Sequence, residues 1–149
     1  MKKQALITGA TSGIGRATAL RLAAEGYDIT ATGRRAERLE TLRREIEAAG
    51  GRCTALVFDV RSEAEVRKFL SPLERVDLLI NNAGLAAGLE HIDQGDTADW
   101  DAMIDTNVKG LLYVTRVVTP KMVAAGGGHV FNIGSIAGTE AYENCAVYA

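Results

Sequence analysis

A glycine-rich segment near the amino terminus is the first place where residue types and spacing suggest chemistry. It reads Thr8-Gly9-Ala10-Thr11-Ser12-Gly13-Ile14-Gly15 and lies between an apolar run and a helical pattern. Gly9 would let the chain turn sharply out of a strand, Gly13 would let the backbone approach a pyrophosphate, and Gly15 would permit close packing of helix on strand. Free N–H groups at the helix start would then bind an anion. The segment predicts a phosphate-binding loop made of Gly9, Thr11, Ser12, Gly13, Ile14 and Gly15.

The spacing of the glycines restricts the class of nucleotide that the loop could bind. Gly-x-x-x-Gly-x-Gly differs from the common Gly-x-Gly-x-x-Gly dinucleotide pattern, and the Lys-Ser or Lys-Thr pair of a nucleoside triphosphate loop does not follow it. A nucleoside triphosphatase is therefore disfavoured. The alternative interpretation is a tight connection between strand and helix that binds no ligand.

The end of the second apolar run indicates which dinucleotide would bind. It reads Thr32-Gly33-Arg34-Arg35, so a glycine occupies the place where NAD-selective sheets carry an acidic residue. Two arginines can hold a 2′-phosphate in a fork of hydrogen bonds, which favours NADP over NAD as the cofactor. Asp59, at the end of the third run, could accept a hydrogen bond from the adenine amino group. The alternatives are a solvated helix start for the two arginines and an ordinary turn carboxylate for Asp59.

Apolar runs alternate along the chain with amphipathic segments, and these elements must position the loop residues. The alternation is typical of βαβ units around a parallel sheet, and it predicts an α/β fold with a doubly wound, three-layer sheet of the Rossmann type. The expected strands are 4–8, 27–32, 53–58, 76–80 and 129–133. The expected helices are 14–25, 36–49, one that opens at a Ser62–Glu65 capping box and ends before Pro72, and 100–125 with a break near Asn107. In the first helix, the residues expected to face the sheet are Ile14, Ala17, Leu20, Leu22 and Ala24.

The last residues before Ala149 contain no helix stop, no cap and no polar tail. A fifth strand without a sixth strand or a covering helix would leave an open apolar edge, which intact proteins usually cover or charge. We therefore expect residues 1–149 to be the N-terminal part of a single dinucleotide-binding domain whose C-terminal strands and helices are missing.

Composition excludes several classes of protein. Hydrophobic residues make up 47% and charged residues 24%, and the net charge is −2, which fits one globular domain and offers no basic face to nucleic acid. The apolar runs are far shorter than the roughly 20 residues of a membrane span, so we expect a cytoplasmic protein. Cys53 and Cys145 form no paired motif, and His91 and His129 lack metal-ligand spacing, so we predict plain thiols and no metal site.

Several motifs occur together in an order and spacing that a known family shares. They are Thr8-Gly9-x-x-x-Gly13-Ile14-Gly15, Asp59-Val60, Asn81-Asn82-Ala83-Gly84, Asn107, Gly134-Ser135 and Tyr148. The whole chain thereby resembles the short-chain dehydrogenases/reductases. Within that family, residues 31–35, 82–86 and 100–107 are similar to the NADP-dependent 3-hydroxy acid dehydrogenases that act on serine and allo-threonine.

The resemblance implies an oxidoreductase that transfers a hydride between NADP(H) and an alcohol or carbonyl carbon, with Asn107, Ser135 and Tyr148 as catalytic residues. Tyr148 would exchange a proton with the substrate oxygen, Ser135 would hydrogen-bond that oxygen, and Asn107 would hold a water in the proton route. Further cofactor contacts implied by the resemblance come from Asp59, Val60, Asn82, Ala83 and Gly84.

The family's lysine, four residues after the tyrosine, would stand at position 152, beyond Ala149. We therefore expect the full-length enzyme to be active and the 149-residue chain alone to be inactive or nearly so. The broad apolar surface of the segment 107–123 suggests a contact between subunits, hence a homo-oligomer. The alternative functions are a 3-oxoacyl carrier-protein reductase, a broad carbonyl reductase and, in another class, a non-catalytic NADP-binding sensor or scaffold.

Overall fold

A parallel five-stranded sheet forms the centre of the computed structural model, which describes residues 2–88, 90–140, 143 and 146–148. Over these residues the strand order is β3-β2-β1-β4-β5. The strands are β1 (Gln4–Ile7), β2 (Asp28–Gly33), β3 (Cys53–Val57), β4 (Leu78–Asn81) and β5 (His129–Asn132). The strand order reverses direction at β1, which lies between β2 and β4. Ligands of open α/β sheets bind beside such a reversal, at the carboxyl ends of the strands.

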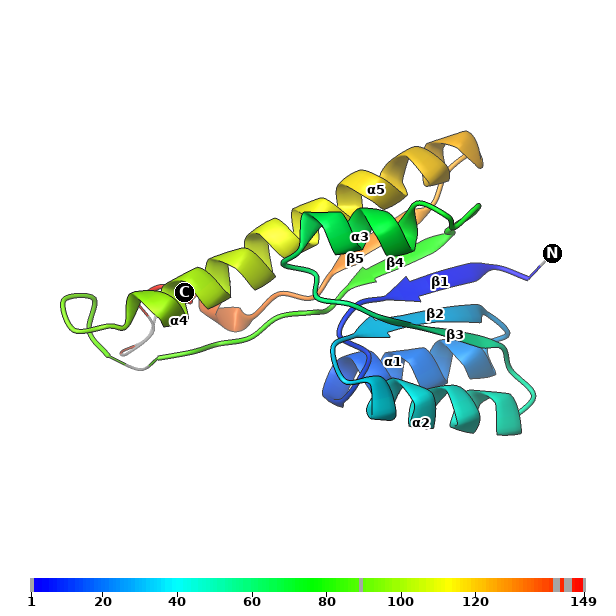
Figure 1. Ribbon diagram of the computed structural model, residues 1–149, viewed down its shortest axis with the longest axis horizontal. Helices are drawn as coiled ribbons and strands as arrows, with labels where there is room; N and C mark the ends of the chain where they lie inside the picture. Colours follow the sequence, from blue (N-terminus) through cyan, green and yellow to red (C-terminus); the bar gives the residue numbers. More distant parts are fainter. Residues whose placement is uncertain (1, 89, 141–142, 144–145, 149) are drawn as a thin grey trace.

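Helices cover both faces of the sheet. One face carries α1 (Gly13–Ala24) and α2 (Ala36–Ala48), and the other carries α3 (Glu63–Leu70) and α5 (Leu111–Ala124) (Figure 1). Neighbouring residues of β1 point to opposite faces, so Ile7 packs in the core under α1 and α2 while Leu6 packs in the core under α3 and α5. The predicted doubly wound, three-layer α/β fold is confirmed.

The rotation of α1 differs from the prediction. The expected sheet-facing stripe is wrong at three exposed positions, Ile14, Ala17 and Ala24. Gly15 and Ala19 are buried instead, and Leu22 packs beside them. The turn before the helix accounts for this rotation, since Gly15 packs directly on Gly9 and so faces the sheet. Ile14, 63% exposed, is thereby turned away from the core.

A π-helical segment replaces the break that the sequence predicts near Asn107. The helix α4 (Thr97–Met103) continues through the π-helix η1 (Ile104–Gly110) into α5 without interruption. The combined helix extends past the carboxyl ends of the strands (Figure 1). A Cβ on Gly110 would lie 2.8 Å from Cγ2 of Val60, so a glycine is needed where η1 meets the turn after β3. Segments of π-helix inside α-helices are frequent at functional sites.

The predicted capping box at the start of α3 is only half formed. The hydroxyl of Ser62 accepts a hydrogen bond from the N–H of Glu65 at 3.3 Å, as a capping box requires. The carboxylate of Glu65 accepts from the N–H of Asp59 at 2.9 Å and not from Ser62. Glu65 therefore ties the turn after β3 to α3. The other helix and strand ends agree with the prediction or differ from it by at most three residues.

Cys53 is a buried free thiol, and burial raises its pKa to about 11, so it is protonated at neutral pH. The prediction for Cys145 concerns a residue outside the described ones. No helix within the described ranges is long and apolar enough to cross a bilayer.

Candidate functional site

The turn from β1 into α1 forms an open backbone cradle. Gly9 has a φ of +67°, and a Cβ there would lie 2.9 Å from the Cα of Ala83. Gly13 has a φ of +54° with no atom within 4 Å of where its Cβ would be, so space is free in front of the loop. A Cβ on Gly15 would collide with the Gly9 carbonyl and the Asn82 side chain. The sharp turn predicted at Gly9 and the close packing predicted at Gly15 are thus present, and Gly13 leaves the open space that a pyrophosphate would need.

The loop after β4 is bound directly to this cradle. The hydroxyl of Thr8 accepts hydrogen bonds from the N–H groups of Asn82 and Ala83, both at 3.0 Å. The amide of Asn82 donates to the carbonyls of Thr8 at 2.9 Å and Gly9 at 3.2 Å. Thr8 is not among the predicted site residues. The sequence places Thr8 at the end of β1. A threonine at that place does not by itself indicate that its hydroxyl would bind the loop after β4.

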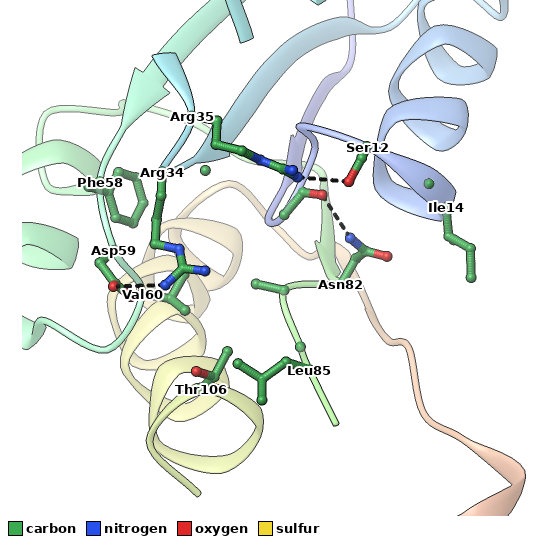
Figure 2. A pocket seen from close by; sticks show the side chains of 15 residues that line it. Ser12, Ile14, Arg34, Arg35, Phe58, Asp59, Val60, Asn82, Leu85 and Thr106 are labelled. Carbon is green, nitrogen blue, oxygen red and sulfur yellow. Dashed lines mark hydrogen bonds and ion pairs between the residues drawn. The ribbon is translucent and has the colours of Figure 1, made fainter. Parts of the chain in front are cut away.

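A cavity of about 440 Å³ opens between the cradle, the end of β2 and the turn after β3 (Figure 2). Most of the predicted cofactor residues line it, namely Gly9, Ser12, Gly13, Ile14, Arg34, Arg35, Asp59, Val60, Asn82, Ala83 and Gly84. Thr11 and Gly15 do not line it, because both are buried inside the loop. Phe58 and Thr106 also line it, and sequence reasoning gave neither of them a role. Gly33 and Leu85 line it as well, and the sequence motifs include both without naming them as cofactor contacts.

The two arginines at the end of β2 are held in different ways. Arg35 donates to the hydroxyl of Ser12 at 2.8 Å and, through Nε, to the hydroxyl of Thr11 at 3.1 Å. Its partners are neutral, so no carboxylate among the described residues cancels its charge. Arg34 lies with Nη1 at 3.7 Å from Oδ2 of Asp59, across the mouth of the cavity (Figure 2). Both guanidinium groups are therefore available at the rim where a 2′-phosphate is expected.

Gly33 is required for the packing of Thr11 beneath the arginines. A Cβ at position 33 would lie 2.6 Å from the methyl group of Thr11, so the site where NAD-selective sheets carry an acidic side chain has no room for one. An acidic residue at position 33 would therefore disturb the contact between β2 and the phosphate-binding loop.

Asp59 has a stronger partner than Arg34. The guanidinium of Arg61 donates to Asp59 Oδ2 from Nη2 at 2.7 Å and from Nε at 3.0 Å, and the N–H of Arg61 donates to Oδ1 at 3.0 Å. Burial raises the pKa of Asp59, but the Arg61 bonds and the charges of Arg61 and Arg34 outweigh that effect and lower the pKa below its usual value. Asp59 is therefore ionised at neutral pH.

A second cavity, of about 470 Å³, adjoins the first. The residues common to both linings are Ile14, Asn82, Ala83, Gly84 and Leu85. The three predicted catalytic residues, Asn107, Ser135 and Tyr148, all line the second cavity. The structure thus brings together one residue from η1, one from the end of β5 and one from the last described segment.

The side chains of two of these residues have defined partners. Asn107 accepts the N–H of Leu85 at 2.9 Å and donates to the carbonyl of Leu85 at 2.7 Å, so it fastens η1 to the loop after β4. The hydroxyl of Ser135 accepts from the N–H of Ala137 at 3.2 Å, which leaves its own proton available to a ligand. This cavity therefore offers a hydroxyl and a phenol next to the cavity in front of the cradle.

Comparison with known proteins identifies similar chains. The family described as short chain dehydrogenase matches residues 3–149. NADP-dependent 3-hydroxy acid dehydrogenase YdfG of Escherichia coli (strain K12) is 44% identical over 147 residues, which cover 96% of this chain and 58% of that protein. Sulfoacetaldehyde reductase 2 of Chromohalobacter salexigens is 46% identical over 148 residues, again 96% of this chain and 58% of that protein.

A search of solved structures also finds a dehydrogenase. The closed form of serine dehydrogenase complexed with NADP⁺ matches with a TM-score of 0.92 at 43% identity, covering 97% of this chain and 59% of that one. The chain thus spans 58% of the length of the curated relatives named above.

Proposed function

Because this chain belongs to the short-chain dehydrogenase family, we propose that the full-length protein that contains it is an NADP(H)-dependent oxidoreductase acting on the alcohol or carbonyl group of a small substrate. One observation carries the proposal, namely that Asn107, Ser135 and Tyr148 line a cavity that shares five lining residues with the one in front of the glycine cradle. When bound, the nicotinamide of NADP(H) supplies or accepts the hydride.

The residues of the first cavity fit the adenosine and pyrophosphate parts of NADP(H). The N–H groups at the start of α1 and the open space at Gly13 suit a pyrophosphate. Arg34 and Arg35 would hold the 2′-phosphate, and Gly33 leaves no acidic side chain to repel it. The names of the relatives, which include an NADP-dependent dehydrogenase and a dehydrogenase solved with NADP⁺, support the same cofactor.

The residues of the second cavity would manage the proton that accompanies hydride transfer. The Tyr148 phenol would exchange a proton with the substrate oxygen, and the Ser135 hydroxyl would donate a hydrogen bond to that oxygen. Asn107 would keep η1 joined to Leu85, and so fix the wall of the cavity beside the reacting atoms, while taking part in the water route that the family resemblance implies.

A 3-hydroxy acid is the substrate we favour. The support is the 44% identity to a 3-hydroxy acid dehydrogenase and the match to serine dehydrogenase. The 46% identity to a sulfoacetaldehyde reductase favours a second candidate, a short aldehyde with a sulfonate. The named substrates of these relatives share a small carbon skeleton with an acidic group.

The experiment is a test of Tyr148→Phe in the full-length protein. NADP⁺ reduction with serine and NADPH oxidation with sulfoacetaldehyde would be followed by the absorbance of the reduced nicotinamide. We expect kcat to fall at least about 100-fold, the usual contribution of a general acid or base, while the dissociation constant of NADPH changes less than about twofold.

Tyr113→Phe is the matched control, because Tyr113 lies on α5 and packs against the core. Its activity should stay within about twofold of the wild type. Undiminished turnover by Tyr148→Phe would remove Tyr148 from the chemistry, and absence of NADPH binding to the wild type would remove the cofactor assignment.

A further inference from the structure

Arg61 is the principal partner of Asp59, although Arg61 is not among the residues that line the cavity. It supplies hydrogen bonds to both carboxylate oxygens, at 2.7 and 3.0 Å to Oδ2 and 3.0 Å to Oδ1. Arg34 approaches the same Oδ2 only to 3.7 Å, at the outer limit of an ion pair. The carboxylate is therefore satisfied by Arg61 even when Arg34 moves away.

The turn that presents Arg61 is fixed at several points. The N–H of Asp59 donates to the carboxylate of Glu65 at 2.9 Å, and the N–H of Ser62 donates to the carbonyl of Asp59 at 3.0 Å. The side chain of Val60 packs closely on Gly110 of η1. Arg61 thus reaches Asp59 from a turn whose backbone is already fixed by these contacts.

The negative charge of Asp59 would affect the binding of a phosphate at Arg34. A phosphomonoester carries roughly −1.5 to −2 charges at neutral pH, and the side chain of Asp59, 24% exposed, lies at the same rim as Arg34. An unpaired carboxylate there would repel the phosphate and would also compete with it for Arg34. When Asp59 is paired with Arg61, it neither repels the phosphate nor competes for Arg34. Arg34 can then bind the phosphate without leaving the partly buried carboxylate unpaired.

We propose that Arg61 is a specificity-determining positioning residue, which holds and neutralises Asp59 and so releases Arg34 for the 2′-phosphate that distinguishes NADP from NAD. Arg61 acts through Asp59 and needs no contact of its own with the cofactor. This inference rests on the proposed function of the site. It adds a third arginine, outside the cavity, to the two that the sequence indicates.

The test measures equilibrium binding of two fragments of the cofactor to the full-length protein by titration calorimetry. Adenosine 2′,5′-bisphosphate carries the 2′-phosphate and 5′-AMP does not, and neither needs the nicotinamide part of the site. For Arg61→Gln we expect the affinity for the bisphosphate to fall about fivefold more than the affinity for 5′-AMP, because both fragments carry the adenine that Asp59 could bind but only one carries the 2′-phosphate.

A double-mutant cycle with Asp59→Asn shows whether Arg61 acts through the carboxylate. In the Asp59→Asn background, Arg61→Gln should change bisphosphate affinity by less than about twofold, because there is no charge left to neutralise. Arg61→Lys, which keeps the positive charge, should retain most of the bisphosphate affinity. Arg67→Gln is the matched control, since Arg67 pairs with Glu63 at 2.9 Å on α3 and should leave both affinities unchanged.

The outcomes separate this inference from the proposed function. A wild-type protein that binds neither the bisphosphate nor NADPH overturns the proposed function and the inference together. A wild type that binds both, with Arg61→Gln unchanged, overturns the inference alone. Equal loss for both fragments indicates a structural role, and a loss that persists with Asp59→Asn indicates direct phosphate contact; either result overturns it.

Discussion

Gly15 is the residue of the cradle where the lack of a side chain has the clearest consequence. In Gly15→Ala the new methyl group would meet the Gly9 carbonyl and the Asn82 side chain. We expect the free energy of unfolding to fall by about 1–3 kcal/mol through overpacking, and NADPH binding to be lost because the loop is displaced. Urea unfolding and NADPH titration of the full-length protein check this.

Gly138→Ala is the control for that substitution. No atom lies within 4 Å of a Cβ at Gly138, and its φ is outside the left-handed region. Its free energy of unfolding should stay within about 0.5 kcal/mol of the wild type. If Gly15→Ala is equally stable, the close contact between α1 and the loop does not determine the fold of the cradle.

Some residues of the site could be predicted from their types and others could not. Glycines at a strand-to-helix junction and paired arginines at a strand end carry a physical signal, because few other residues could serve there. Arg61 carries none, since an arginine two residues after an aspartate is usually solvated. Phe58 and Thr106 line the cavity only because of how β3 and η1 are placed. The exposure of Ile14 likewise follows from the rotation of a whole helix.

At the scale of elements, the sequence predicts the order and approximate ends of the helices and strands. It does not predict η1, because a π turn differs from an α turn by about one residue and the apolar residues of segment 107–123 spread too broadly to reveal the change of period. The nearest prediction is the break in the helix near Asn107. Asn107 has an unexpected partner instead, the backbone of Leu85.

Asp77 joins the amino-terminal ends of two strands and should make stability depend on pH. It accepts the N–H of Gln4 at 2.8 Å and Nε of Arg75 at 2.8 Å. Burial raises its pKa, but the bonds from Arg75 and Gln4 and the nearby positive charges outweigh this and lower it. Because the folded pKa lies below that of the unfolded chain, Asp77 stabilises the fold above about pH 4 and loses that effect as the pH falls through its folded value.

Asp77→Asn therefore should be less stable than the wild type at neutral pH, and the difference should shrink below about pH 4. Chemical unfolding at a series of pH values measures this. The sign is decisive, since a difference that widens on acidification would show that the ionised form of Asp77 does not stabilise the folded state.

The whole molecule presents an apolar surface along η1 and α5. Val114 and Val118 are buried in the core, but Val108 is 52% and Leu112 is 56% exposed. The sequence suggests a subunit contact along this helix, which stays a prediction. We expect Leu112→Glu to weaken self-association of the full-length protein at least about tenfold, because the contact would have to bury an unpaired charge.

Size-exclusion chromatography with light scattering over a range of concentrations measures that association. Ala17→Glu is the control, since this substitution adds the same charge at an exposed position of α1, which lies across the sheet from α5. A wild-type protein that is monomeric at every concentration would contradict the predicted contact.

The π turn of η1 also determines which way the side chains of the preceding helix, α4, point around the helix axis. One additional residue rotates the preceding helix by about 100° around its axis compared with an unbroken α-helix. Asp99, Trp100 and Met103 of α4 line a small recess together with Tyr148. A variant of the same length in which Ile104–Gly110 winds as an α-helix would therefore turn different side chains of α4 toward Tyr148. Deletion of one residue from that segment would instead remove the π turn and keep the side chains of α4 that neighbour Tyr148.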